Sequence, residues 1–229
     1  MRDELISARG VKRFYDSGEL KVAALDGVDL SIERGAYVVL AGRSGSGKTT
    51  LLNMLGGLDR PDAGSLSIAG QDMLAMTVAE RAGFRLHHLG FVFQAYNLIR
   101  VLNARENVAY VLQLQGMDKK QRFELADQWL AKVGLSGFEK RRPDQMSGGQ
   151  QQRVAVARAL AAGPDLVLAD EPTANLDSHT GESLMALMRQ LNDEKSTTFV
   201  IASHDPAVIA SARTLITMQD GKVESVKNL

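Results

Sequence analysis

The chain has 229 residues, of which 45% are hydrophobic, enough to bury a full core in one large domain or in a domain with a sizeable insertion. Basic and acidic residues balance at 27 each and the pI is about 6.9, whereas nucleic-acid-binding domains typically exceed about 9, so we expect no nucleic-acid partner. The chain has no cysteine, which excludes disulfides and thiolate metal sites and suits a reducing cytosol. The first residues show no signal-peptide pattern, and no apolar run approaches the roughly 18 to 20 residues that span a bilayer. Any membrane role therefore needs a partner.

The N-terminal residues predict a small antiparallel sheet. Residues 28–33 alternate between apolar and polar side chains, the period-two pattern of a half-buried strand, and residues 5–11 supply a second strand. Between them the pattern places Phe14 and Tyr15 in a polar loop. An exposed aromatic side chain there needs no special explanation on its own.

The next segment has the form of a phosphate-binding loop. Residues 42–49 read GRSGSGKT, which fits the P-loop pattern G-x-x-x-x-G-K-[ST], also called Walker A. A strand-like apolar run, residues 36–41, precedes it, and residues 49–55 read as a helix whose N-terminus faces the phosphates. In such a loop the backbone N–H groups point inward, Lys48 supplies charge for the outer phosphates, and the Thr49 hydroxyl can ligate Mg²⁺. The pattern predicts a nucleotide site and disfavours the alternative, a flexible glycine loop.

The core pattern continues after the P-loop helix. Residues 65–68 read as a short strand, and Thr77 with Glu80 forms a capping box for a helix over residues 78–89. Residues 90–93 then predict a buried strand that ends directly before Gln94.

A helical pattern follows. Asn103 caps one helix, and a second helix covers residues 119–133. We therefore predict a helical subdomain, residues 95–163, inserted into a core made of residues 1–94 and 164–229.

A second glycine-rich helix start lies within this insertion. Ser147 and Gln150 fit an S-x-x-Q capping box, with Gly148 and Gly149 between them, directly before an apolar helix. The N–H groups and the helix dipole, equivalent to about half a positive charge, make such a start a candidate anion site. Alone it would be an ordinary glycine-rich entry to a helix, but its occurrence in a chain with a P-loop favours the anion site.

Polar side chains end two further predicted strands. The apolar run at residues 166–169 is followed by Asp170 and Glu171, and the run at residues 197–202 by Ser203 and His204. Carboxylates at the carboxyl ends of buried parallel strands are costly unless they serve an active-site crevice or a metal. Asp170 can hold Mg²⁺, and Glu171, pointing the other way, can orient or deprotonate the attacking water.

These motifs together resemble the ATP-binding subunit of an ATP-binding-cassette (ABC) transporter, and the resemblance covers essentially the whole chain, residues 1–229. It implies a single α/β domain of the P-loop NTPase (RecA-like) type, with a parallel-sheet core, an N-terminal antiparallel β subdomain and the inserted helical subdomain. It implies ATP and Mg²⁺ as cofactors, Glu171, His204 and Gln94 as catalytic residues, and Thr49, Gln94 and Asp170 as metal ligands. The implied ATP-binding residues are Tyr15, which stacks on adenine, Gly42, Arg43, Ser44, Gly45, Ser46, Gly47, Lys48, Thr49, Thr50, Ser147, Gly148, Gly149, Gln150 and Asp177.

The resemblance also implies partners and a location. Two copies would pair head to tail, so that the Ser147 segment of one covers the γ-phosphate held by Lys48 of the other. The dimer would power a separate integral membrane permease at the cytoplasmic face of the inner membrane. Residues 91–99 and 172–177 look most like the group that includes lipoprotein-release, macrolide-export and cell-division ATPases.

The chain departs from the family pattern at three positions. Arg43 stands where proline is common, and its effect is not predicted. Thr49 replaces a commoner serine but keeps the hydroxyl, and Met146 replaces a leucine but keeps the apolar bulk.

Two other functions stay open at this point. A soluble cassette ATPase acting on DNA or ribosomes would be expected to carry a second cassette, a coiled-coil insertion or a basic face, and none is visible. A nucleotide-dependent clamp that signals across the membrane without moving a substrate has no sequence feature against it. A GTPase is disfavoured because the guanine motif Asn-Lys-x-Asp does not occur.

The apolar segment at residues 96–102 lies beside Gln94 and is a candidate socket for a permease helix. The alternative is that it packs inside the helical insertion.

Overall fold

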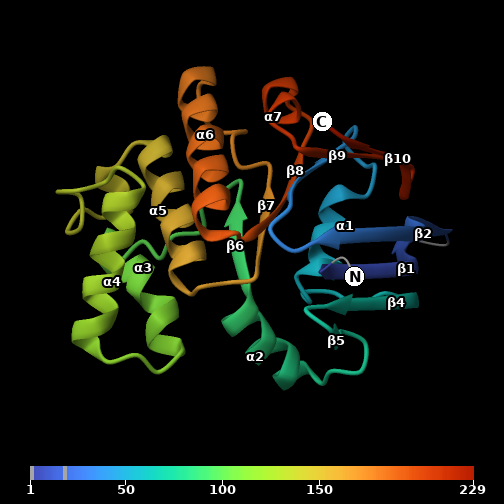
Figure 1. Cartoon of the computed structure of the whole chain (residues 1–229), viewed down its shortest axis with the longest axis horizontal. Coiled ribbons are helices and arrows are strands. Elements are labelled where there is room, and N and C mark those ends of the chain that lie inside the picture. Colours follow the sequence, from blue (N-terminus) through green and yellow to red (C-terminus); the bar gives the residue numbers. More distant parts are fainter. Residues whose placement is uncertain (1–2, 18–19) are drawn as a thin grey trace.

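The structure, a computed structural model, describes residues 3–17 and 20–229 and contains two sheets with helices around them (Figure 1). A four-stranded antiparallel sheet has the order β2-β1-β4-β5, with bounds Glu4–Ser17 (β1), Leu20–Glu33 (β2), Ala63–Ile68 (β4) and Gln71–Asp72 (β5). A six-stranded sheet has the order β10-β9-β3-β8-β7-β6, with bounds Tyr37–Ala41 (β3), Leu89–Phe93 (β6), Leu166–Asp170 (β7), Thr198–Ser203 (β8), Thr214–Gln219 (β9) and Lys222–Asn228 (β10). Five of its strands run parallel and β10 returns antiparallel to β9. The predicted fold class is confirmed.

One strand prediction is wrong. Phe14 and Tyr15 do not lie in a loop but within β1, where Tyr15 pairs with Val22 of β2. The error arises because β1 changes register several times along its length, which breaks the simple alternation expected of a strand.

The three helices with predicted capping boxes begin where those patterns predict. Their bounds are Lys48–Leu55 (α1), Val78–His88 (α2), Ala104–Leu114 (α3), Lys119–Lys132 (α4), Gly148–Ala161 (α5), Ser178–Lys195 (α6) and Pro206–Ala210 (α7), with a 3₁₀ turn at Pro143–Gln145. Capping boxes at Thr77, Asn103 and Ser147 are all formed. No helix within the described residues is long and apolar enough to cross a membrane.

The six-stranded sheet separates two hydrophobic clusters. Alternate residues of β3 point to opposite faces, Val39 toward the helices α3 to α6 and Val38 toward α1 and the four-stranded sheet. In Figure 1, α3, α4 and α5 lie together at the left, and β1, β2, β4 and β5 at the right. Buried residues of α3 to α5, such as Trp129, share a cluster with the sheet, so the boundary of the helical subdomain stays a prediction.

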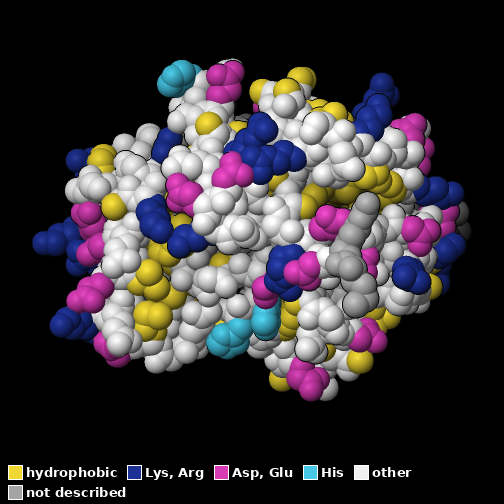
Figure 2. All heavy atoms as spheres, in the orientation of Figure 1, with side chains coloured by type: hydrophobic (Ala, Val, Ile, Leu, Met, Phe, Trp, Pro, Cys, Tyr) yellow, Lys and Arg dark blue, Asp and Glu magenta, His cyan; other side chains and the backbone are white. Residues whose placement is uncertain are grey.

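On the face shown in Figure 2, Lys and Arg side chains are interspersed with Asp and Glu, as the equal totals of 27 lead one to expect.

Candidate active site

The P-loop joins β3 to α1, and its shape depends on contacts with two other segments. Gly47, the N-cap of α1, has φ of 100°, and a Cβ there would lie 2.6 Å from the carbonyl oxygen of Ala24 in β2. A Cβ on Gly42 would lie 2.4 Å from the carbonyl oxygen of Met218 in β9. The backbone of the loop is thus pressed between β2 and β9, which requires glycine at both positions.

Lys48 lies at the centre of the loop. Its side chain is buried, and its Nζ donates to the carbonyl oxygens of Gly42 at 2.7 Å and Arg43 at 3.1 Å. These bonds hold the ammonium beside the first N–H groups of α1, where the helix dipole also favours an anion.

Three strand ends bring the predicted catalytic residues to the same edge of the sheet. Phe93, Asp170 and Ala202 lie opposite one another across β6, β7 and β8. The residues that follow them, Gln94 and Glu171 among them, therefore emerge together. Asp170 Oδ1 accepts a hydrogen bond from the Thr49 hydroxyl at 3.3 Å.

Burial raises the pKa of Asp170, and the neighbouring Glu171 carboxylate raises that pKa further, against the lowering effect of the Thr49 hydrogen bond. A cation at this carboxylate would offset both effects. The Thr49 hydroxyl and the Asp170 carboxylate meet here, and Gln94, which lines the same cavity as Thr49, carries an amide oxygen. These are the hard oxygen ligands that Mg²⁺ prefers. Thr49, Asp170 and Gln94 therefore fit a magnesium ion.

Glu171 is held in an unusual conformation. Its φ is 45°, in the left-handed region that costs a non-glycine residue of order 1 kcal/mol, and its N–H donates to the carbonyl oxygen of Ala202 at 2.9 Å. Its carboxylate accepts a hydrogen bond from the Ser203 hydroxyl at 2.9 Å and lies 2.7 Å from His204 Nδ1. The strain and the two contacts together fix the direction of this carboxylate.

A cavity of about 490 Å³ collects most of the predicted site. Its lining residues are Tyr15, Val22, Ala23, Ala24, Ser44, Gly45, Ser46, Gly47, Lys48, Thr49, Thr50, Gln94, Glu171 and His204. Gly42 and Arg43 line a neighbouring hollow with the turn between β9 and β10. No local pattern indicated Val22, Ala23 or Ala24, because each is ordinary in its own strand and reaches the site only through strand pairing. Ser203 was indicated only as a polar residue at a strand end, and its hydrogen bond to Glu171 was not predicted.

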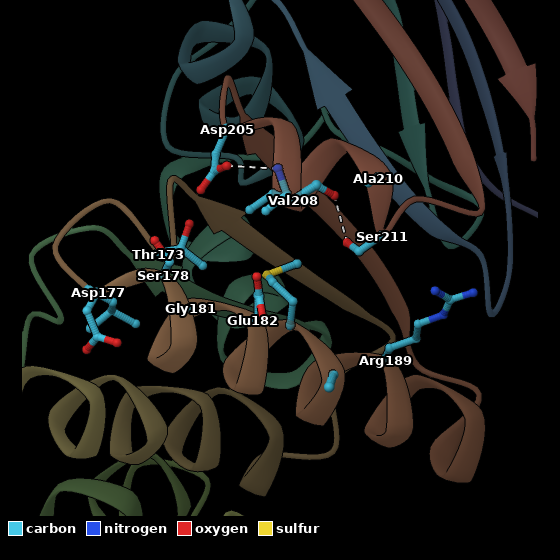
Figure 3. A pocket seen from close by; sticks show the side chains of 14 residues that line it. Thr173, Asp177, Ser178, Gly181, Glu182, Arg189, Asp205, Val208, Ala210 and Ser211 are labelled. Atoms are coloured by element: carbon cyan, nitrogen blue, oxygen red, sulfur yellow. Dashed lines mark hydrogen bonds between the residues drawn. The ribbon is translucent and has the colours of Figure 1, made fainter.

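The Ser147 segment and Asp177 lie outside this lining. Ser147 and Gln150 bond each other in the capping box, and a Cβ on Gly149 would lie 2.4 Å from Cγ2 of Thr180 in α6. Asp177 caps α6 by accepting from the Thr180 N–H at 2.9 Å. Figure 3 shows Asp177 at a second cavity, of about 530 Å³, between α6 and α7. The starts of α5 and α6 therefore form one surface, separate from the P-loop cavity.

The candidate permease socket is partly filled by the chain itself. Leu98 packs against the core cluster, as the inward-packing alternative expects, and Ile99 is half-buried. Tyr96 and Asn97 have positive φ, and Arg158 of α5 donates to both of their carbonyl oxygens.

The sequence profile of the ABC transporter family matches residues 25–174. The chain belongs to this family. It is 44% identical over 96% of its length to the macrolide export ATP-binding/permease protein MacB of Aggregatibacter actinomycetemcomitans, and 47% identical over 93% to that of Chromobacterium violaceum. It spans about a third of those relatives, 34% and 33% of their lengths.

Solved structures of the family have the same fold over the whole chain. The ATP-binding cassette MJ0796, in a dimeric post-hydrolysis state bound to ADP and Pi, is 40% identical with a TM-score of 0.90, and the comparison covers 98% of both chains. CbiO1 from Clostridium perfringens, part of the transporter complex cbiONQ, has 25% identity and a TM-score of 0.89 over 99% of this chain and 89% of its own. The chain is thus an ATPase domain with the ABC fold.

Proposed function

We propose that this ATPase domain hydrolyses ATP–Mg at a site completed by a second copy of the chain and that the hydrolysis powers a membrane permease of the exporter type. The observation that carries the proposal is the division of the predicted ATP-binding residues into two surfaces. One, around the P-loop, also holds the strand-end carboxylates, and the other, the start of α5, is a capped helix N-terminus directed elsewhere.

The P-loop surface supports the following roles. Lys48 and the N–H groups of α1 bind the phosphates, and Tyr15 takes the base. Thr49, Asp170 and Gln94 would hold Mg²⁺, which when bound neutralises charge on the outer phosphates.

Glu171 orients the attacking water and accepts its proton as oxygen attacks the γ-phosphorus and the bond to the β–γ bridging oxygen breaks, giving ADP and phosphate. The contacts of Glu171 with Ser203 and His204 keep its carboxylate aimed at that water.

A second copy is the source of the missing contacts to the γ-phosphate. MJ0796, which matches this chain over 98% of its length, forms dimers. In a head-to-tail pair the Ser147 segment and Asp177 of one protomer would face the P-loop of its partner. The N–H groups of Gly148 and Gly149, in the first turn of α5, have no acceptor within the helix and are suited to an anion.

A groove of about 300 Å³ beside Gln94 is the proposed permease contact. Its lining includes Leu89, Phe91, Phe93 and Val111, with Arg158 at its edge. The rings of Phe91 and Phe93 stack with centroids 5.7 Å apart and leave both side chains only half-buried. The MacB relatives are named as ATP-binding/permease proteins, which supports a membrane segment as the occupant. We propose that the chain acts at the cytoplasmic face of the membrane.

The test has two arms. The purified chain should release phosphate from ATP only when Mg²⁺ is present. The tagged chain should capture one integral membrane protein from detergent-solubilised membranes of its source, and Phe91→Asp should lose that protein while still binding ATP. Capture that is equal for the wild type and Phe91→Asp would contradict the groove assignment.

A further inference from the structure

Tyr15, the residue proposed to take the base, is held on one side by a charged pair. Its hydroxyl donates to Asp59 Oδ2 at 2.9 Å, and Arg13 Nε donates to the same oxygen at 3.0 Å. The guanidinium carbon of Arg13 lies 4.8 Å from the centroid of the Tyr15 ring. One face of the ring is therefore covered by a cation, and Tyr15 as a residue is 39% exposed.

Asp59 is fixed to the helix that carries the P-loop lysine. Its Oδ1 accepts from the Arg60 N–H at 2.7 Å, so its carboxylate cannot rotate without breaking a bond. Its own N–H donates to the carbonyl oxygen of Asn53 in α1. Because α1 begins at Lys48, one rigid helix connects the phosphate end of the site to the support of the Tyr15 ring.

Asp62 adds a second attachment. It accepts from Arg13 Nη1 at 3.1 Å and from the backbone N–H of Phe14 at 2.8 Å. The strand that carries Tyr15 is thus tied to the turn after α1 through both a side chain and the backbone.

These contacts fix the ring before any nucleotide binds. A tyrosine on a hairpin that had to be ordered by the ligand would reduce affinity, because ordering a side chain and its loop opposes binding. The bonds to Asp59 remove that cost in advance, and the guanidinium on one face leaves the other face for a base.

We infer that Arg13 and Asp59 are positioning residues of the nucleotide site, which set the distance between the Tyr15 ring and the P-loop so that base and phosphates bind together. The inference rests on the proposed function, in which Tyr15 takes the base. It assigns Arg13 and Asp59 no contact with the nucleotide.

The test compares two ligands that share the phosphates but not the base. The dissociation constants of ATP–Mg and inorganic tripolyphosphate–Mg are measured by calorimetry for the wild type, Arg13→Met and Tyr15→Phe. Arg13→Met should weaken ATP binding roughly three- to tenfold and leave tripolyphosphate binding unchanged. In hydrolysis assays KM should rise with little change in kcat, because Arg13 acts on binding and not on the reacting atoms.

Tyr15→Phe removes only the hydroxyl and keeps the ring. It should also raise the ratio of the ATP to the tripolyphosphate dissociation constant, but by a smaller factor than Arg13→Met. If Arg13→Met does not fold, Tyr15→Phe still tests the inference. Lys12→Met is the matched control, since Lys12 is the neighbouring residue on β1 and pairs with Asp26 at 2.9 Å, away from Asp59. It should leave both dissociation constants unchanged.

Equal weakening of ATP and tripolyphosphate by Arg13→Met would overturn the inference, because it would reveal a general loss of structure or charge. An unchanged ATP dissociation constant in both Arg13→Met and Tyr15→Phe would overturn the inference as well. Tyr15→Ala separates the two levels: if it lowers ATP affinity alone while Arg13→Met has no effect, only the positioning role fails. If Tyr15→Ala leaves the ratio unchanged, the base site of the proposed function fails.

Discussion

The chain contains two glycine-rich helix starts, at α1 and at α5, and they are completed very differently. At α1 the buried ammonium of Lys48 lies beside the helix end, and the strand-end residues Asp170 and Glu171 share its edge of the sheet. At α5 the cap is closed internally by Ser147 and Gln150. No titratable side chain is among Ser147, Gly148, Gly149 and Gln150.

The difference shows that the start of α1 has charged and catalytic side chains beside it, whereas the start of α5 presents only backbone N–H groups at the surface. In the proposed dimer, an anion at the second start would take its remaining ligands from the P-loop of the partner protomer. Substitutions at the first start remove its chemistry, and mixtures of variants test whether the second start serves the first across a dimer.

The largest effect is expected for Glu171→Gln. Removing the general base should lower kcat by about 10² to 10⁴ while ATP still binds, because the amide keeps the size of the side chain but accepts no proton. Phosphate release and ATP calorimetry measure the two properties. Hydrolysis within a few fold of the wild type would exclude Glu171 from this role.

The second prediction concerns Lys48→Ala. Loss of a charge-assisted contact to phosphate, worth ~1.5–3 kcal/mol, should weaken ATP–Mg binding by about 10- to 150-fold. Calorimetry is the measurement, and circular dichroism controls for folding. Tight ATP binding by a folded Lys48→Ala protein would contradict the assignment of the phosphate site to the start of α1.

A third test mixes two variants, Lys48→Ala, which impairs the start of α1, and Ser147→Arg, which impairs the start of α5. A dimer of one Lys48→Ala and one Ser147→Arg protomer has one site with both wild-type surfaces, and half of randomly mixed dimers have this composition. The mixture should therefore regain up to about a quarter of wild-type activity at an ATP concentration at which each variant alone hydrolyses far less. A mixture as inactive as its components would show that two intact sites must act together or that the surfaces do not meet.

The smallest expected effect is a pH dependence from Asp170. Because burial raises its pKa, protons compete with Mg²⁺ from a higher pH than at an ordinary carboxyl group, so Mg²⁺ affinity should fall on acidification, by at most about tenfold per pH unit. Asp170→Asn should abolish this dependence along with most of the affinity. A fall in Mg²⁺ affinity that begins at no higher pH than for an ordinary carboxyl group would contradict it.

Asp170 should also make the stability of the Mg²⁺-free protein depend on pH. Acidification weakens Mg²⁺ binding, but it should raise the free energy of unfolding of the Mg²⁺-free protein. The folded state binds the proton more tightly than the unfolded state, so the free energy of unfolding falls as pH rises through the raised pKa. Asp170→Asn should therefore be more stable than the wild type at neutral pH in the absence of Mg²⁺, which thermal unfolding measures.

Local patterns were sufficient for the parts of the site that the backbone itself builds. Residues close together in the sequence encode each of these parts. They are the P-loop, the capping boxes at Thr77, Asn103 and Ser147, and the polar residues after β7 and β8. Each follows from hydrogen-bonding rules that act within a few positions.

Contacts between distant segments were not predictable. Tyr15 and Asp59 are 44 positions apart, and neither residue is unusual in its own segment. The left-handed backbone of Glu171 depends on its contact with β8, which no local pattern encodes. The apolar pattern at residues 96–102 fitted both a permease socket and inward packing, and only the fold shows that Leu98 packs against the core cluster.

The most direct test of the pairing between the two helix starts is the mass of Glu171→Gln in solution, measured by size-exclusion chromatography with light scattering. The slow variant should retain ATP, so at saturating ATP–Mg its mass should be twice the 24.8 kDa of the chain, and it should return to 24.8 kDa with ADP. Adding Ser147→Arg should keep it monomeric while ATP still binds. A Glu171→Gln protein that stays at 24.8 kDa with ATP bound, or a dimer that forms equally well with Ser147→Arg, would contradict the account.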